Sequence, residues 1–139
     1  MNNVTKEMMK IWHMKKMDWM GYALEKREIF SYHHLRVAKR DGGPINIWNG
    51  AVLIQTAGHD YLHVIERYER KLFEDITKIL IEINEQRFMP TRDQLLTIHS
   101  ILESFERLYS KERTSTGRLI VKDRYLRRFD DVESFRRNL

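Results

Sequence analysis

The sequence predicts an α+β fold, in which a β-hairpin and the helix after it are embedded in a mainly helical single domain, residues 1–139. Two observations lead to this prediction. Between residues 30 and 54, short strand-like runs alternate with glycine-containing turns. The segments on either side carry apolar residues at helical spacings of three and four. The 139 residues, of which 42% are hydrophobic, suffice for one domain with its own core.

The composition excludes several classes of protein. The chain has no cysteine, which excludes disulfide bonds and thiolate zinc sites. No apolar run approaches the ~20 residues that a membrane span needs. The N-terminus has no uninterrupted apolar core and no cleavage site of a secretory signal. We therefore expect a soluble, cytoplasmic protein that has no membrane partner.

The net charge of +5 is unevenly distributed. Residues 1–58 carry nine Lys/Arg and five Asp/Glu, a balance of +4. Residues 59–110 carry seven and ten, a balance of −3, and residues 111–139 carry nine and five, again +4. The two basic parts favour a polyanion partner such as DNA, with RNA as an alternative.

The first predicted element is a helix over residues 4–20. Apolar side chains such as Met8, Ile11 and Met17 recur there at mixed spacings of three and four. Gly21 ends this pattern. We expect the Met and Trp side chains of this helix to contact the core.

The hairpin is predicted from two strand-like runs. Residues 31–37 form the first predicted strand, and residues 39–44 (KRDGGP) form a turn with two glycines and a proline. Residues 45–48 form the second predicted strand. A second turn is predicted at Asn49-Gly50, before the apolar run of residues 51–54.

A long helix is predicted after Gly58. At about 100° per residue, with His59 at 0°, the apolar residues between Tyr61 and Ile83 centre near about 220°. His63 lies about 40° from His59, so both histidines point away from the face that packs on the core. A break near residues 67–70 would alter the later angles but not the pairing of the two histidines.

A further helix is predicted to start at Pro90 and Thr91, with Thr91 as its N-cap. The apolar stripe of this helix runs from Leu95 to Phe105, and His99 borders it and is predicted to be structural. The basic C-terminal tail, residues 122–139, mixes arginines with aromatic residues. It either follows a nucleic-acid backbone or is a docked or frayed charged tail.

The candidate metal-binding and catalytic residues are concentrated in the segment from the first predicted strand to the start of the long helix. Four of the six histidines lie there, His33, His34, His59 and His63, with Asn49 between the two pairs. Histidines four residues apart on a helix share one face and can both ligate one metal ion. A third ligand from a neighbouring strand would complete a three-histidine site with positions open for water or phosphate.

This order of elements resembles the HNH (ββα-metal) endonuclease family over about residues 30–67, a quarter of the chain. The paired histidines, the asparagine in the hairpin and the HxxxH helix are most similar to the nuclease colicins. In that fold a β-hairpin and one helix enclose a single metal ion. The resemblance implies metal-assisted hydrolysis of phosphodiester bonds in DNA, in a phage, mobile-element or bacterial defence context.

The resemblance also implies roles for individual residues. His33, His59 and His63 would be the metal ligands, His34 the general base, and Asn49 the brace that holds the hairpin and helps to orient His34. The ion would be Zn, Ni, Mg or Mn, because three imidazoles suit zinc or nickel while activity can depend on magnesium or manganese.

Neighbouring side chains have predicted roles as well. Arg36, Lys39 and Arg40 lie on or beside the hairpin and are predicted to bind neighbouring phosphates. Glu66 follows His63 by three residues and is expected to be solvated. His34 directly follows a strand ligand, so both histidines can share one site only if the strand ends, twists or bulges there.

Two other functions remain open. A nuclease-derived binding protein, such as a phage inhibitor of a host enzyme, would use the same fold without cutting. Alternatively, the ion would only support folding. The presence of His34, Asn49 and all three ligand positions favours the enzyme. A protein partner or a homo-oligomer remains open too.

Overall fold

The structure is a computed structural model that describes residues 1–11 and 17–128. Its helices are α1 (Asn3–Ile11), α2 (Asp60–Tyr68), α3 (Arg70–Glu85) and α4 (Arg92–Tyr109), and its strands are β1 (Phe30–His34) and β2 (Gly50–Ile54). Short helical turns lie at η1 (Lys39–Asp41), η2 (Ile47–Asn49), η3 (Gln55–His59) and η4 (Asp123–Leu126). The described residues thus confirm the α+β class.

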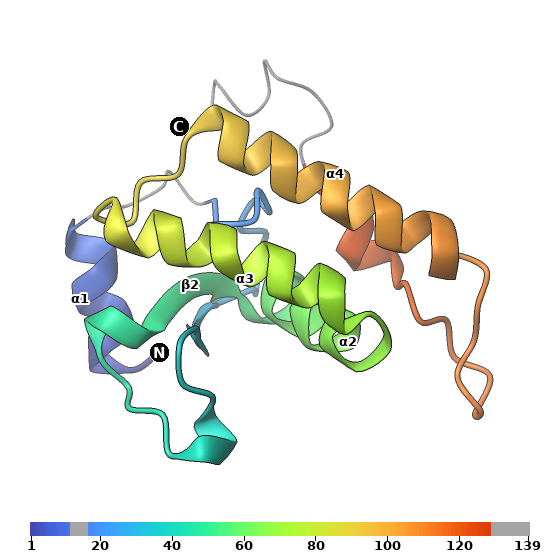
Figure 1. Ribbon diagram of the computed structural model, residues 1–139, viewed down its shortest axis with the longest axis horizontal. Coiled ribbons are helices and arrows are strands. Elements are labelled where there is room, and N and C mark those ends of the chain that lie inside the picture. Colours follow the sequence, from blue (N-terminus) through green and yellow to red (C-terminus); the bar gives the residue numbers. More distant parts are fainter. Residues whose placement is uncertain (12–16, 129–139) are drawn as a thin grey trace.

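The helices form a layer over the hairpin. Figure 1 shows α3 and α4 side by side above β2 and α2, and α3 contacts all three of these elements. Side chains from each element fill the core between them, among them Leu53, Leu62, Ile76, Leu80, Ile98 and Phe105. No helix within the described ranges combines the length and the apolar character that a membrane span requires.

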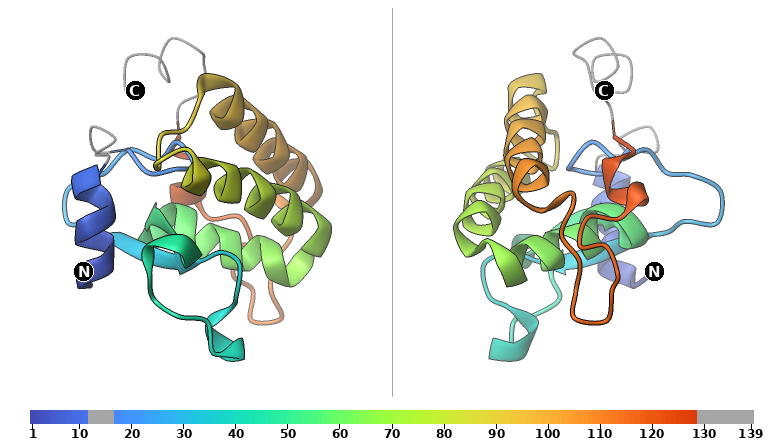
Figure 2. Two further views of the ribbon diagram at one scale, coloured as in Figure 1. Left: turned by 60° about the vertical axis from the view of Figure 1, so that its left-hand side comes forward. Right: turned by 90° about the vertical axis from the view of Figure 1, so that its right-hand side faces the viewer.

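The two strands form an antiparallel pair, in which Phe30 lies opposite Ile54 and His34 opposite Gly50. Residues 35–49 connect them as a long loop that projects from the body of the molecule (Figure 1 and Figure 2). The predicted strand at residues 45–48 is therefore wrong. Polar capping competes with the extended conformation there, because the Asn46 side chain accepts a hydrogen bond from the backbone N–H of Asn49 and starts η2.

The sequence predicted that Gly50 is a turn residue, but Gly50 is the first residue of β2. Its glycine is required by a close approach, because a Cβ at this position would lie 2.1 Å from a ring carbon of Tyr32 on β1. Gly50 therefore serves strand packing, whereas Asn49 ends the turn η2, and the apolar run after them belongs to the second strand.

The N-terminal segment differs from the predicted helix over residues 4–20. Helix α1 ends at Ile11, and residues 12–16 lie outside the described residues. The buried Asp18 then organises the chain, since its carboxylate accepts hydrogen bonds from the backbone N–H groups of Met20, Tyr22 and Ile54. A helix cannot continue here, because the N–H groups of Met20 and Tyr22 bind this side chain and not the carbonyls of a preceding turn.

The other helix predictions agree with the structure. The long helix is broken at Glu69, whose φ of −142° and ψ of 77° separate α2 from α3. Thr91 caps α4, because its hydroxyl accepts a hydrogen bond from the Gln94 N–H while the Gln94 side chain accepts one from the Thr91 N–H. This reciprocal pair is the capping box that favours a helix start.

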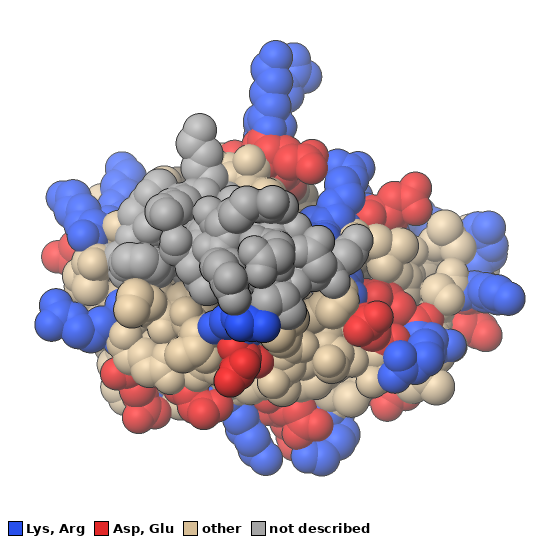
Figure 3. Space-filling model, turned by 90° about the horizontal axis from the view of Figure 1, so that it is seen from above, with Lys and Arg blue, Asp and Glu red and all other residues tan. Residues whose placement is uncertain are grey.

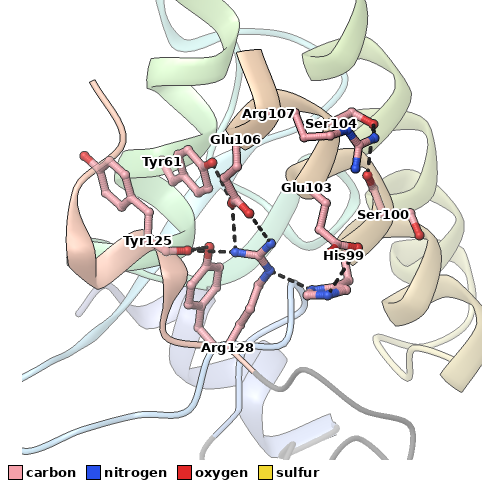
Figure 4. Close-up of polar contacts among 10 residues, drawn as sticks. Tyr61, His99, Ser100, Glu103, Ser104, Glu106, Arg107, Tyr125 and Arg128 are labelled. Atoms are coloured by element: carbon pink, nitrogen blue, oxygen red, sulfur yellow. Dashed lines mark hydrogen bonds and ion pairs between the residues drawn. The ribbon is translucent and has the colours of Figure 1, made fainter. Parts of the chain in front are cut away.

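The described part of the basic tail is docked. Figure 4 shows Arg128 between Glu106, His99 and Tyr125. Its guanidinium lies 2.8 Å from a Glu106 carboxylate oxygen, and its Nε donates to Nδ1 of His99 at 2.9 Å. His99 is thus structural, as predicted. Residues 129–139, the remainder of the predicted tail, lie outside the described residues.

Candidate metal centre

Strand β1 and the start of α2 bring three of the predicted histidines together. The His33 ring centroid lies 5.1 Å from that of His59 and 5.2 Å from that of His63, and the latter two are 5.0 Å apart. One possible ligand atom from each residue lies within 4.8 Å of the other two. Three imidazoles are a donor set that suits a divalent ion such as zinc.

His33 gives the first physical reason to expect an ion. It is 3% exposed, and neither ring nitrogen has a hydrogen-bond partner among the described residues. An unpaired buried polar group costs about 1–3 kcal/mol, so such groups are rare in folded proteins. A metal ion would supply a partner for one of the two ring nitrogens. Burial also lowers the pKa of His33, which keeps the ring neutral, as ligation requires.

Ser31 determines which nitrogen of His59 is free. The Ser31 Oγ lies 2.7 Å from His59 Nδ1 and 3.0 Å from the Leu53 carbonyl oxygen. A hydroxyl has a single proton, and the carbonyl can only accept it, so Nδ1 of neutral His59 is the group that donates to Ser31. His59 Nε2 is then unprotonated and available as a ligand. Burial lowers the pKa of His59 to about 4, so the ring is neutral at neutral pH.

Sequence analysis did not identify Ser31. The available signal was its position two residues before His33, because alternate residues of a strand share one face. We expect Ser31→Ala to weaken zinc binding by about 10–100-fold, the range for partners that orient a ligand. Isothermal titration calorimetry measures this, with Ser31→Thr as the variant that keeps the hydroxyl. Equal zinc affinity of Ser31→Ala and the native chain would contradict the assigned role.

His63 is oriented by a carboxylate. Its Nδ1 lies 3.2 Å from a carboxylate oxygen of Glu66, which directs the other ring nitrogen away from this partner. The side chain of Glu66 is only 18% exposed and also contacts Arg70 at 3.4 Å and Arg40 at 4.0 Å. The expectation that Glu66 is solvated is therefore wrong, because residues three and four apart on a helix, and the loop above it, enclose the carboxylate.

His34 lies at the edge of the same site. It is the last residue of β1, so the condition that the strand ends there is met. Its ring is hydrogen-bonded to the backbone of Gly43 and packs edge-on against Tyr32, while Nε2 is buried without a partner in residues 1–11 and 17–128. Burial, assisted by the charge of Lys39, lowers the pKa of His34 and so favours the neutral ring. Because Nε2 has no partner, Nδ1 is the nitrogen that donates to the Gly43 backbone, which leaves Nε2 of the neutral ring as an unprotonated acceptor.

Asn49 is fully buried and braces the loop between the strands. Its Oδ1 accepts hydrogen bonds from the N–H groups of Arg36 and Val37, both at 2.8 Å. Its Nδ2 donates to the carbonyls of Val37 at 2.9 Å and Pro44 at 3.1 Å. The predicted strand to Val37 therefore ends early, because Asn49 takes the N–H groups that would extend the ladder. Pro44 follows Gly43, so Asn49 also steadies the segment that holds His34.

All four histidines line one cleft of about 1010 Å³. The loop forms one wall and the start of α2 another. The charged residues of its lining are four bases and two acids: Arg36, Lys39, Arg40, Arg70, Asp41 and Glu66. This excess of bases favours an anionic ligand. By contrast, Lys/Arg and Asp/Glu are interspersed over the described part of the surface that Figure 3 shows from above.

The three predicted phosphate contacts lie in different surroundings. Arg36 is bound internally: its guanidinium donates to the Trp48 carbonyl, to Asn84 at 3.2 Å and to Glu85 at 3.2 Å. Lys39 and Arg40 lie on η1 and are exposed. Lys39 and Arg40 are thus exposed toward solvent, with Arg40 also 4.0 Å from Glu66, whereas Arg36 ties the loop to α3.

Comparisons of the chain with protein-family models, with curated proteins and with solved structures found no match. The functional conclusion therefore depends on the residues and geometry of this centre alone.

Proposed function

We propose that this chain is a metal-dependent endonuclease of the HNH type that hydrolyses phosphodiester bonds in DNA. One observation carries the proposal: His33, His59 and His63 converge, with unpaired nitrogens on His33, beside His34 in a basic cleft. A structural ion would need the three ligands but not a fourth imidazole with an unpaired acceptor nitrogen.

The ligand residues are suited to hold one divalent ion, and zinc or nickel fits three imidazoles best by affinity. When bound, such an ion supplies a Lewis acid that stabilises negative charge on the scissile phosphate and the departing oxygen. Ser31 and Glu66 keep the rings of His59 and His63 oriented toward the centre.

The chain's other residues perform the proton transfer and the positioning. His34 accepts a proton from the attacking water at Nε2, a role for which a neutral imidazole is suited. Gly43 and Tyr32 hold its ring, and Asn49 steadies the loop behind Gly43. Lys39 and Arg40 bind phosphates on either side of the scissile bond.

Supercoiled plasmid DNA provides the test. The full chain with added Zn²⁺, Ni²⁺, Mg²⁺ or Mn²⁺ should convert it to nicked or linear forms, and the same chain with a chelator should not. DNA binding without cleavage would contradict the proposal and favour a nuclease-derived binding protein. A metal that raises thermal stability without DNA binding or cleavage would favour a purely structural ion.

The basic turn η1 carries a second expectation. Lys39→Ala combined with Arg40→Ala should weaken DNA binding equally for all sequences and reduce the salt slope by about two, one for each lost phosphate contact. Anisotropy titrations between low and moderate salt measure the slope. Lys71→Ala combined with Lys78→Ala removes the same charge from α3, outside the cleft lining, and serves as the control. A slope equal to that of the control would show that η1 does not contact phosphate.

A further inference from the structure

The returning end of the loop between β1 and β2, just before β2, carries an exposed apolar patch, formed by Ile45, Ile47 and Trp48. Ile45 is 52% exposed, Ile47 36% and Trp48 53%. Exposed single apolar residues are common, but three within four positions on a projecting loop form a patch of the kind that marks an interaction site. Trp48 is the largest of them, and nothing in the hydrolytic mechanism uses it.

The backbone of this apolar patch is fixed by its neighbours, because η2 contacts α1 and is hydrogen-bonded to α3. Asn84 of α3 donates hydrogen bonds to the carbonyls of Ile47 and Gly50, both at 2.8 Å. Arg36 donates to the carbonyl of Trp48. The backbone around the indole is therefore tied to α3. The conformation of the apolar patch is thus set before any ligand binds, which lowers the entropic cost of binding.

Arg36 contacts the apolar patch and also lines the basic cleft. Its guanidinium carbon lies 4.9 Å from the centroid of the Trp48 ring, so a cation covers part of the indole. Arg36 and Ile45 also line the cleft that contains the histidines. Trp48 is not itself part of the cleft lining, but its ring is in contact with Arg36, which is, so the indole lies beside the cleft.

We propose that Trp48 is a stacking platform for a nucleobase next to the scissile phosphate. The inference rests on the proposed function and narrows its substrate to DNA with an unpaired base at this point, either single-stranded or locally unstacked. The charges argue for nucleic acid over a second copy of this chain, because Lys39 and Arg40 on the same loop would repel their own copies and attract phosphates. Base stacking on an aromatic ring tolerates any sequence.

The test compares Trp48→Ala with Trp48→Phe on two single strands of equal length, one normal and one abasic, both phosphorothioate-linked so that cleavage is slow. Fluorescence anisotropy with the metal-loaded full chain reports the Kd. Trp48→Ala should raise the Kd for the normal strand about tenfold, and Trp48→Phe much less, since stacking contributes about 1–3 kcal/mol per base. Neither variant should change the Kd for the abasic strand.

Equal losses on both strands, or no loss on either, would overturn the stacking role. The stacking role would also be overturned if Trp48→Ala converted an oligomer to monomers but kept the native Kd. That result would assign the apolar patch to self-association. These results are independent of the proposed hydrolysis. If the native chain leaves plasmid DNA intact while the Trp48 effect is confined to the normal strand, hydrolysis fails and the stacking site stands.

Discussion

His34→Ala is expected to keep the metal ion, the fold and the DNA affinity, and to lower the cleavage rate about 10²–10⁴-fold, the range for a positioned general base. The reason is the proposed division of the histidines: His33, His59 and His63 lie close enough together to hold an ion, while the ring of His34 contacts Gly43 and Tyr32 and leaves Nε2 unpaired among the described residues. Cleavage rate and metal content, measured on the same preparation by gel assay and elemental analysis, check this.

Added imidazole makes the test of His34 sharper. If the missing group is a base, free imidazole should restore part of the cleavage by His34→Ala and should not affect the native chain. His34→Gln, which retains a polar side chain but no basic nitrogen, should resemble the alanine variant. Loss of the ion from His34→Ala, or cleavage at the native rate, would show that the roles of the adjacent histidines are assigned wrongly.

His63→Ala is expected to lose the metal and the activity together. Of the three proposed ligands, His63 is the best one to remove, because its side chain is 54% exposed and its loss leaves no cavity in the core, unlike that of His33. Loss of a residue that only orients a ligand weakens metal binding by up to about 100-fold, and we expect His63→Ala to weaken zinc binding by more than that. Calorimetric titration measures the affinity, and plasmid cleavage measures the activity.

Thermal unfolding provides the control for His63→Ala. In the native chain, saturating zinc should raise the Tm, because the ion binds the folded state preferentially. In the variant the Tm without metal should stay close to the native value, and zinc should no longer raise it. A variant that still binds one equivalent of zinc at native affinity would exclude His63 from the ligand set.

The parts of the site that local sequence predicted are those that depend on backbone periodicity. Four residues make about one helical turn, so His59 and His63 lie on one face whatever surrounds the helix. The N-cap at Thr91 is equally local, since both partners of the capping box are three residues apart. Backbone periodicity does not locate the start of the second strand, because the Asn46 cap and the packing of Tyr32 on Gly50 determine where that strand begins.

The sequence by itself thus determined that His59 and His63 share one helical face at the start of α2, and that a short strand before them carries His33 and His34. Only the tertiary structure decided the hydrogen-bond partners of the site residues, because these partners lie far away in the sequence. Ser31 contacts His59, and Arg36 contacts Asn84 and Glu85. These contacts join residues that are 28 to 49 positions apart, so they depend on how the core packs the elements together and are not predicted by local spacing. The tautomer of His59, the internal role of Arg36 and the rigid exposure of Trp48 all follow from that packing.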